Sequence, residues 1–182
     1  MAQFQNGLDI GPCRLLIGTT VIGDTLGGIK IQHSLETKET KTDQKGRVGK
    51  YVLDAIVTGV GALTQATLAD LAVMFPWLDI DSHDTRLSFN SPIGTDLRDY
   101  AALATFKPIV NGVVSVTEGD WIRIPCAVFE PDIDLPMTTE DQKVFGFKFA
   151  GYPILAADIA SGGHLYPNTE TWAAGESMVW GD

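Results

Sequence analysis

The sequence is short of the residues that carry most protein chemistry. Its three histidines are scattered, and its two cysteines, Cys13 and Cys126, match no metal-ligand or redox spacing. We expect both cysteines to be buried thiols, with one disulfide as the alternative. The motifs of a nucleophile elbow and of a P-loop are absent. We therefore expect no enzyme, no cofactor and no metal site, although 23 acidic residues always place some carboxylates close together.

Long hydrophobic runs are also lacking. No segment approaches the roughly 18 apolar residues that a membrane-spanning helix needs. The first residues, MAQFQNGLDIGPC, have neither the basic nor the apolar region of a signal peptide. We therefore expect synthesis in the cytoplasm and no membrane contact. With 182 residues, of which 45% are hydrophobic, the chain has the size and composition of one globular domain.

Basic residues are scarce and unevenly placed. The net charge of -10 argues against a protein that binds DNA through its phosphates regardless of sequence. Residues 30–50 carry six basic and three acidic residues, whereas no Lys or Arg follows Lys148. This pattern has two interpretations, which the sequence leaves open. One is a solvated loop with an acidic tail, and the other is a cationic arm that meets an acidic surface on a neighbouring copy.

Alternating and β-branched residues dominate what is present. The first half predicts strands over residues 14–17, 19–22, 28–32 and 51–60. The one clear helix covers residues 64–75, because Leu68, Leu71, Ala72 and Phe75 form an apolar stripe. We expect Thr64 to be its N-cap and Pro76 to end it.

The second half is again typical of strands. They are expected at residues 86–89, 109–116 and 121–124, with a turn at Asn111-Gly112. Residues 127–129 and 144–149 are expected to pair across the turn region Pro131–Gln142. Residues 100–106 fit a short helix or a loop equally well. Three prolines indicate edge positions or bulges rather than central strands: Pro125, Pro131 and Pro136.

These elements predict an α+β fold that is mainly antiparallel β, with packed sheets in a sandwich-like or barrel-like arrangement and one flanking α-helix. We expect one β domain over residues 1–155. It contains a long polar loop at residues 33–50, too polar for a core. Residues 156–182 are expected to form a C-terminal extension that docks on its own or a neighbouring subunit.

Two short motifs can be interpreted either as binding sites or as ordinary structural elements. Gly59-Val60-Gly61 begins like a dinucleotide-binding fingerprint, but Thr64 stands where the third glycine belongs. We expect a strand-to-helix turn there. Asp79, Asp81, His83 and Asp84 could hold a calcium ion, but their spacing lacks the glycine and the closing glutamate of an EF-hand. A solvated loop is the preferred interpretation.

Read as one pattern, residues 8–155 resemble the tail-tube proteins of long-tailed phages. The order of several short motifs carries this resemblance. They are Ile10-Gly11-Pro12-Cys13, Leu26-Gly27-Gly28-Ile29-Lys30-Ile31, Lys41-Thr42-Asp43-Gln44-Lys45-Gly46, Asp54-Ala55-Ile56-Val57-Thr58-Gly59, the Leu-Ala-Asp-Leu helix at 68–71, Ile124-Pro125-Cys126-Ala127 and Lys143-Val144-Phe145-Gly146-Phe147-Lys148-Phe149-Ala150.

The resemblance implies a structural virion protein with no catalytic residue. In that family six subunits pair their sheets edge to edge into rings, and the rings stack into a tube that conducts DNA without binding it specifically. The implied partners are other copies of the chain and other tail proteins, and the implied location is the virion, after assembly in the host cytoplasm. Family tubes commonly have an acidic lumen, with which the net charge agrees. The candidate contacts between subunits are Lys38, Lys41, Asp43, Gln44, Lys45 and Arg47.

Two alternatives remain at this point. A tube or ring protein of a contractile injection or secretion machine would share the fold. An all-β enzyme or a carbohydrate-binding module belongs to a different class, and the four tryptophans could serve a sugar platform. However, no aromatic pair lies at an obvious spacing on one strand.

Overall fold

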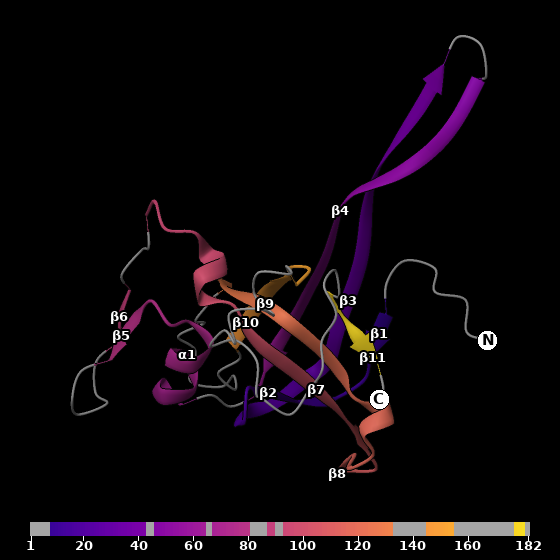
Figure 1. Cartoon of the computed structure of the whole chain (residues 1–182). Coiled ribbons are helices and arrows are strands. Elements are labelled where there is room, and N and C mark those ends of the chain that lie inside the picture. Colours follow the sequence, from indigo (N-terminus) through magenta and orange to yellow (C-terminus); the bar gives the residue numbers. More distant parts are fainter. Residues whose placement is uncertain are drawn as a thin grey trace.

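The chain is mostly antiparallel β-sheet with one small α-helix (Figure 1). The computed structural model describes residues 8–42, 46–64, 67–80, 87–89, 93–132, 145–154 and 177–180. In chain order the elements are β1 (Leu8–Ile10), β2 (Cys13–Ile17), β3 (Thr20–Thr42), β4 (Gly46–Leu63), α1 (Leu68–Met74), β5 (Leu78–Ile80), β6 (Leu87–Phe89), η1 (Leu97–Tyr100), β7 (Ala102–Val110), β8 (Val113–Val114), η2 (Glu118–Asp120), β9 (Ile122–Asp132), β10 (Phe145–Gly151) and β11 (Val179–Trp180).

The main sheet closes on itself into a barrel. Among the described strands, each of β9, β10, β4, β3, β2 and β7 pairs with the next, and β7 pairs again with β9. Every one of these pairings is antiparallel. In a closed barrel each strand pairs with a neighbour on both sides, so no strand edge is left free along the paired stretches. The expectation of a mainly antiparallel β fold with one helix is therefore confirmed, and the sheet arrangement is that of a barrel.

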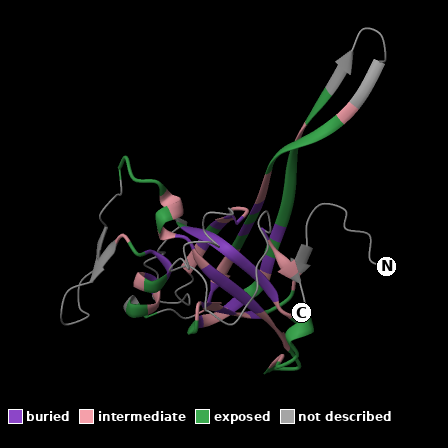
Figure 2. Cartoon of the chain, viewed as in Figure 1, coloured by how far each residue is buried: buried purple, intermediate pink, exposed green. Residues whose placement is uncertain are grey.

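The barrel interior is filled by alternate side chains of its strands. In β2, residues Cys13, Leu15 and Ile17 are buried while the residues between them are partly exposed. Phenylalanines from three strands meet in the centre, with ring centroids of Phe106 and Phe149 5.4 Å apart. Figure 2 shows this buried set concentrated on the crossing strands. Both cysteines are free and buried, as expected.

Two glycines make room for these rings. Gly59 and Gly61 lie within β4, where they pair with Phe149 and Phe147 of β10. A Cβ at either glycine would overlap the ring opposite it. The prediction of a strand-to-helix turn at Gly59-Val60-Gly61 is therefore wrong. Glycine within a strand indicates close approach of a bulky neighbour, and here it serves that purpose.

Helix α1 is shorter than expected. Its N-cap is Thr67, whose hydroxyl accepts a hydrogen bond from the Asp70 N–H at 3.2 Å, while the Asp70 carboxylate accepts one from the Thr67 N–H. The prediction of Thr64 as N-cap is wrong, because the Thr64 hydroxyl donates instead to the Asp24 carbonyl. The helix ends before Pro76, as predicted.

The predicted polar loop at residues 33–50 is wrong. Strand β3 continues to Thr42, and β4 begins at Gly46. The segment is thus the outer part of a β-hairpin. Both faces of a two-stranded ribbon can meet solvent, so the alternation of polar and apolar residues that marks a half-buried strand is absent there. Thr37, Thr40 and Thr42 supply β propensity on the β3 side instead.

The second half follows the sequence more closely. Strands β9 and β10 pair as expected, with Phe129 opposite Phe149. The turn after β7 is also confirmed, and both of its residues, Asn111 and Gly112, have positive φ angles of 52° and 76°. The predicted strand at 86–89 is β6. For residues 100–106, the structure shows the end of η1 followed by β7.

A bulge in β9 accommodates its first proline. Between the pairs Ala102–Ala127 and Ala104–Ile124, β9 has one residue more than β7, and Pro125 lies in this bulge. The predicted edge or bulge position is therefore confirmed for Pro125. Pro136 lies outside the described residues.

The described end of the C-terminal extension lies on its own chain, because β11 pairs with β9. The rest of that extension from residue 156 to 176 lies outside the described residues, as do Asp81, His83 and Asp84 of the acidic cluster.

Candidate assembly surfaces

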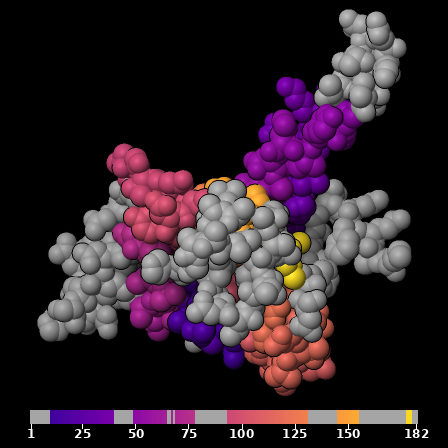
Figure 3. All heavy atoms as spheres, in the orientation of Figure 1, coloured from indigo at the N-terminus to yellow at the C-terminus, as the bar shows by residue number. Residues whose placement is uncertain are grey.

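A two-stranded arm projects from the barrel. On β4, pairing with β10 ends at Val57, and on β3 pairing with β1 ends at Ile31. Beyond these residues β3 and β4 pair only with each other among the described strands. We call residues 32–56 the arm. Figures 1 and 3 show that the described part of the arm stands clear of the rest of the molecule.

Apolar side chains on the arm are exposed. Leu35, Tyr51, Val52 and Leu53 each expose more than half of their surface, and Figure 2 shows exposed residues along both strands. An isolated two-stranded hairpin is at best marginally stable in water. Such an arm therefore gains stability when another surface covers its apolar residues.

The arm has two different faces. Cross-strand partners point to the same side, so Leu35 and Ala55 share one face with Val52, which lies opposite Thr37 beyond a β-bulge. This face continues the interior side of the barrel strands, where Ile31 is buried. The other face carries the Glu36–Asp54 pair. The arm is thus apolar on one face and acidic near its base on the other.

The predicted contact residues belong to the outer half of the arm. Lys38 is exposed and lies opposite Tyr51. The backbones of Lys41 and Arg47 pair with each other, but their side chains are not described. Asp43, Gln44 and Lys45 lie outside the described residues. Sequence reasoning missed the exposed apolar residues. The run Tyr51-Val52-Leu53 directly after a polar stretch was the available signal.

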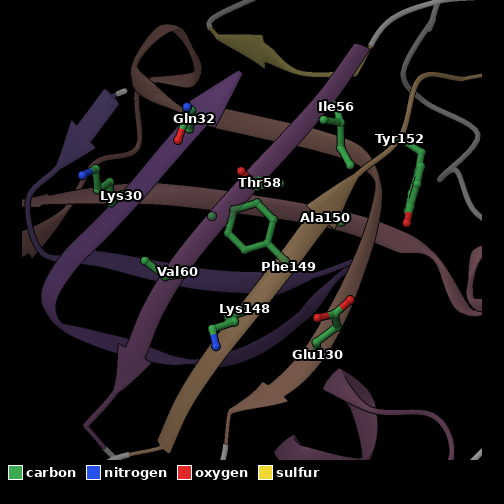
Figure 4. Close-up of a pocket in the computed structure, with 11 residues that line it drawn as sticks. Lys30, Gln32, Ile56, Thr58, Val60, Glu130, Lys148, Phe149, Ala150 and Tyr152 are labelled. Carbon is green, nitrogen blue, oxygen red and sulfur yellow. The ribbon is translucent and has the colours of Figure 1, made fainter. Parts of the chain in front are cut away.

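The outer face of the sheet beside the arm is open and hollowed. A concavity of about 490 Å³ lies over β3, β4, β10 and β9. One cross-strand row there consists of Lys30, Val60, Lys148 and Glu130, and Figure 4 shows these side chains above the strands. The lining is mainly apolar, with charged groups from Lys30, Lys148 and Glu130. An open concavity of this kind suits contact with a large partner better than enclosure of a small ligand.

Two stretches of strand have a free edge next to this face. On β9, pairing with β7 ends at Ala127, so residues 128–132 have a strand partner only in β10 within the described part of the chain. On β3, the residues beyond Ile31 pair only with β4 among the described strands, so their other edge is free there. Free edges are ready sites for pairing with another strand.

The ionisable groups of the barrel have structural roles. Burial raises the pKa of the Cys13 thiol to about 11, so it stays protonated and unreactive at neutral pH. On the outside, the Arg14 guanidinium donates to both carboxylate oxygens of Asp24, at 2.7 and 3.0 Å. This hydrogen bonding lowers the pKa of Asp24.

The described residues contain no group of three or more His, Cys, Asp or Glu side chains that could hold a metal ion. In the same part of the chain, no helix is long and apolar enough to cross a membrane.

Comparison with known proteins assigns the chain to no family. No family model matches the chain, and no curated protein matches it.

Proposed function

We propose that the protein is a self-assembling tube subunit of the phage tail-tube type, whose copies pair into rings and whose rings stack through the arm. The arm carries this proposal. It extends beyond the barrel, has exposed apolar residues on a hairpin that is marginal alone, and belongs to the chain segment with an excess of basic residues. A segment of this kind is expected in a protein that assembles, because a neighbouring copy can cover its apolar residues and a monomer cannot.

Ring formation is supported by the two free edges. Three successive antiparallel pairings connect β9, β10, β4 and β3. The first and last of these four strands, β9 and β3, therefore run in opposite directions. A neighbouring copy rotated about a ring axis would therefore present its β9 antiparallel to the free edge of β3. Each copy uses two different edges for this contact, which is the heterologous arrangement that closes into a ring when the rotation fits.

In such a ring the open sheet face would line the channel. Its described charged side chains are three lysines, Lys30, Lys38 and Lys148, and three carboxylates, Glu36, Asp54 and Glu130. A channel with an excess of carboxylates lets DNA slide, because fixed cations would bind its phosphates. On this face the carboxylates balance the lysines, and the net charge of the chain, -10, supports passage of DNA without specific binding.

The test is removal of the outer arm. Residues 38–51 are replaced by Asn-Gly, which joins Thr37 to Val52, a pair that already lie opposite each other. The shortened protein should fold with the thermal stability of the parent monomer, because none of the removed residues whose side chains are described is buried. Electron microscopy and light scattering should then show long tubes for the parent and none for the variant. Tubes of normal length from the shortened protein would contradict the proposal.

A further inference from the structure

The free edge of β3 begins where its pairing with β1 ends. The two strands are antiparallel, and the first residue of β1, Leu8, lies opposite Ile31. From residue 32 to residue 42, β3 pairs only with β4 among the described strands. We call the edge of residues 32–37 the base edge, because it lies where the arm leaves the barrel. An unpaired strand edge is a template for pairing with any other strand, so a free subunit gains from a cover on it.

The base edge has few of the charges that discourage pairing with other chains. Lysine in an edge strand is one common protection. Residues 38–42 contain two lysines and one glutamate, whereas Glu36 is the one formally charged residue of the base edge with histidine taken as neutral. Leu35 of the base edge is 51% exposed. The base edge is therefore the part of this strand edge that is most open to unwanted pairing.

Strand β1 is held in register beside the base edge. A Cβ at Gly28 of β3 would overlap the Ile10 carbonyl oxygen, and Gly28 has a positive φ angle of 96°. Glycine is thus the residue that suits the place where the two strands come together. Ile10 also packs against the hydrophobic core. Because β1 and β3 are antiparallel, a continuation of β1 before Leu8 would run along the base edge.

The sequence before β1 has the alternation that a strand in this register needs. Continued without a bulge, the pairing of β1 with β3 places Phe4 opposite Leu35. Phe4 follows the two-residue period of Ile10, so its position belongs to the apolar face of the arm. The positions on either side of it, Gln3 and Gln5, belong to the other face, which is acidic near the base. An apolar residue thus falls on the apolar face and polar residues fall on the polar face.

We propose that residues 2–7 extend β1 along the base edge in the free subunit and cover it until a neighbouring copy displaces them. The displacement rests on the proposed function, in which the free edge of the neighbour's β9, residues 128–132, pairs with this edge of β3. Two strands cannot occupy one edge, so residues 2–7 compete with the ring contact. The segment therefore raises the protein concentration at which rings form.

Hydrogen exchange of the unassembled subunit tests the cover. In the parent, the β3 amides that point to the base edge should be protected. If residues 2–7 cover the edge in about nine of ten subunits, deletion of residues 2–6 should accelerate this exchange roughly tenfold. The amides of residues 38–42 should not change. The deletion keeps β1, and circular dichroism checks that the barrel is folded. Equal exchange of the base edge in the two proteins would overturn the proposal.

Two single substitutions test the register. Phe4→Ser removes the apolar contact with Leu35 and should accelerate exchange at the base edge as the deletion does. Gln5→Ser is the matched control, because it introduces the same residue on the other face, and exchange should stay near that of the parent. Equal effects of the two substitutions would contradict a strand in this register.

The same variants test the competition with the ring contact. The deletion variant and Phe4→Ser should form rings at a protein concentration lower by roughly tenfold, because a competent state that one subunit in ten adopts weakens the apparent affinity by that factor. Gln5→Ser should need the concentration of the parent. Sedimentation velocity and electron microscopy measure this. If the deletion variant needs a higher concentration than the parent, the segment contributes to the ring contact and its role as a competitor is wrong.

The two measurements separate this inference from the proposed function. If exchange reveals the cover while no variant forms rings or tubes at any concentration or salt, the cover stands and the tube function is wrong. If the parent forms tubes but its base edge exchanges as fast as that of the deletion variant, the tube function stands and the cover is wrong.

Discussion

Gly59 of β4 lies directly beneath the aromatic ring of Phe149 of β10, its cross-strand partner, with no space for a side chain between them. The ring also stacks against Phe106 across the barrel. The glycine thus determines how closely two strands and the central aromatic cluster can pack.

Gly59→Ala should destabilise the protein, because the new methyl group must displace a buried ring. Overpacking of this kind typically costs about 1–3 kcal/mol, which for a chain of this length lowers Tm by roughly 2–4 °C per kcal/mol. Urea and thermal denaturation would measure the change. Gly49→Ala in the same strand is the control, because the atoms nearest to a Cβ there belong to the Tyr51 ring, at an ordinary 3.5 Å. Equal stability of the two variants would contradict the packing argument.

Thr67→Ala should cost about 1 kcal/mol of stability, the usual effect of losing an N-cap side chain. The reason is that the Asp70 N–H loses its hydrogen-bond acceptor at the start of α1. Thr67→Ser, which keeps a hydroxyl in the same place, should restore most of the loss. Thermal unfolding of the three proteins checks this, and an unchanged Tm for Thr67→Ala would show that the cap contributes nothing.

The Arg14–Asp24 pair makes a pH-dependent contribution to stability. Hydrogen bonds from Arg14 lower the pKa of Asp24 in the folded state, so the pair stabilises above the ordinary carboxyl pKa of about 3.9. That contribution is lost as the pH falls through the lowered value. Since both side chains are more than one-third exposed, solvent limits it to about 0–1 kcal/mol.

Asp24→Asn should therefore be slightly less stable than the parent at pH 7, and the difference should vanish at strongly acidic pH. Urea titrations at a series of pH values would measure both. A difference that stays constant with pH would exclude ionisation of Asp24 as its source.

Replacing Lys38, Lys41 and Lys45 with Glu should weaken ring stacking while leaving the Tm of the monomer unchanged. The effect should be larger at low salt than at high salt, because ions screen the repulsion between the new carboxylates and acidic residues of the neighbouring copy. The three Lys→Gln substitutions are the matched control and should have a smaller effect. Light scattering at several salt concentrations measures it. Normal tubes from the Glu variant at low salt would show that these lysines do not contact the next ring.

Local patterns in the sequence were enough to predict several elements. The turn at Asn111-Gly112, the pairing of β9 with β10 and the end of the helix at Pro76 follow from residues that are close in sequence. Each depends on turn chemistry, alternation or the missing N–H of proline, all of which act within a few residues. The mainly antiparallel β class followed from the same signals.

Only the tertiary structure decided the rest. Closure of the barrel depends on pairing between β7 and β9, and the role of Gly59 depends on a ring ninety residues away in sequence. The sequence predicted a polar loop for the arm because its strands bury too few residues to show a hydrophobic period. The arm is a hairpin because β3 and β4, which pair in the barrel, continue to pair beyond it. Val110 and Val113 in the β7–β8 hairpin are exposed although they have an ordinary strand pattern. Their exposure arises because the hairpin extends beyond the last strand that could cover it, and no local sequence signal records where a neighbouring strand ends.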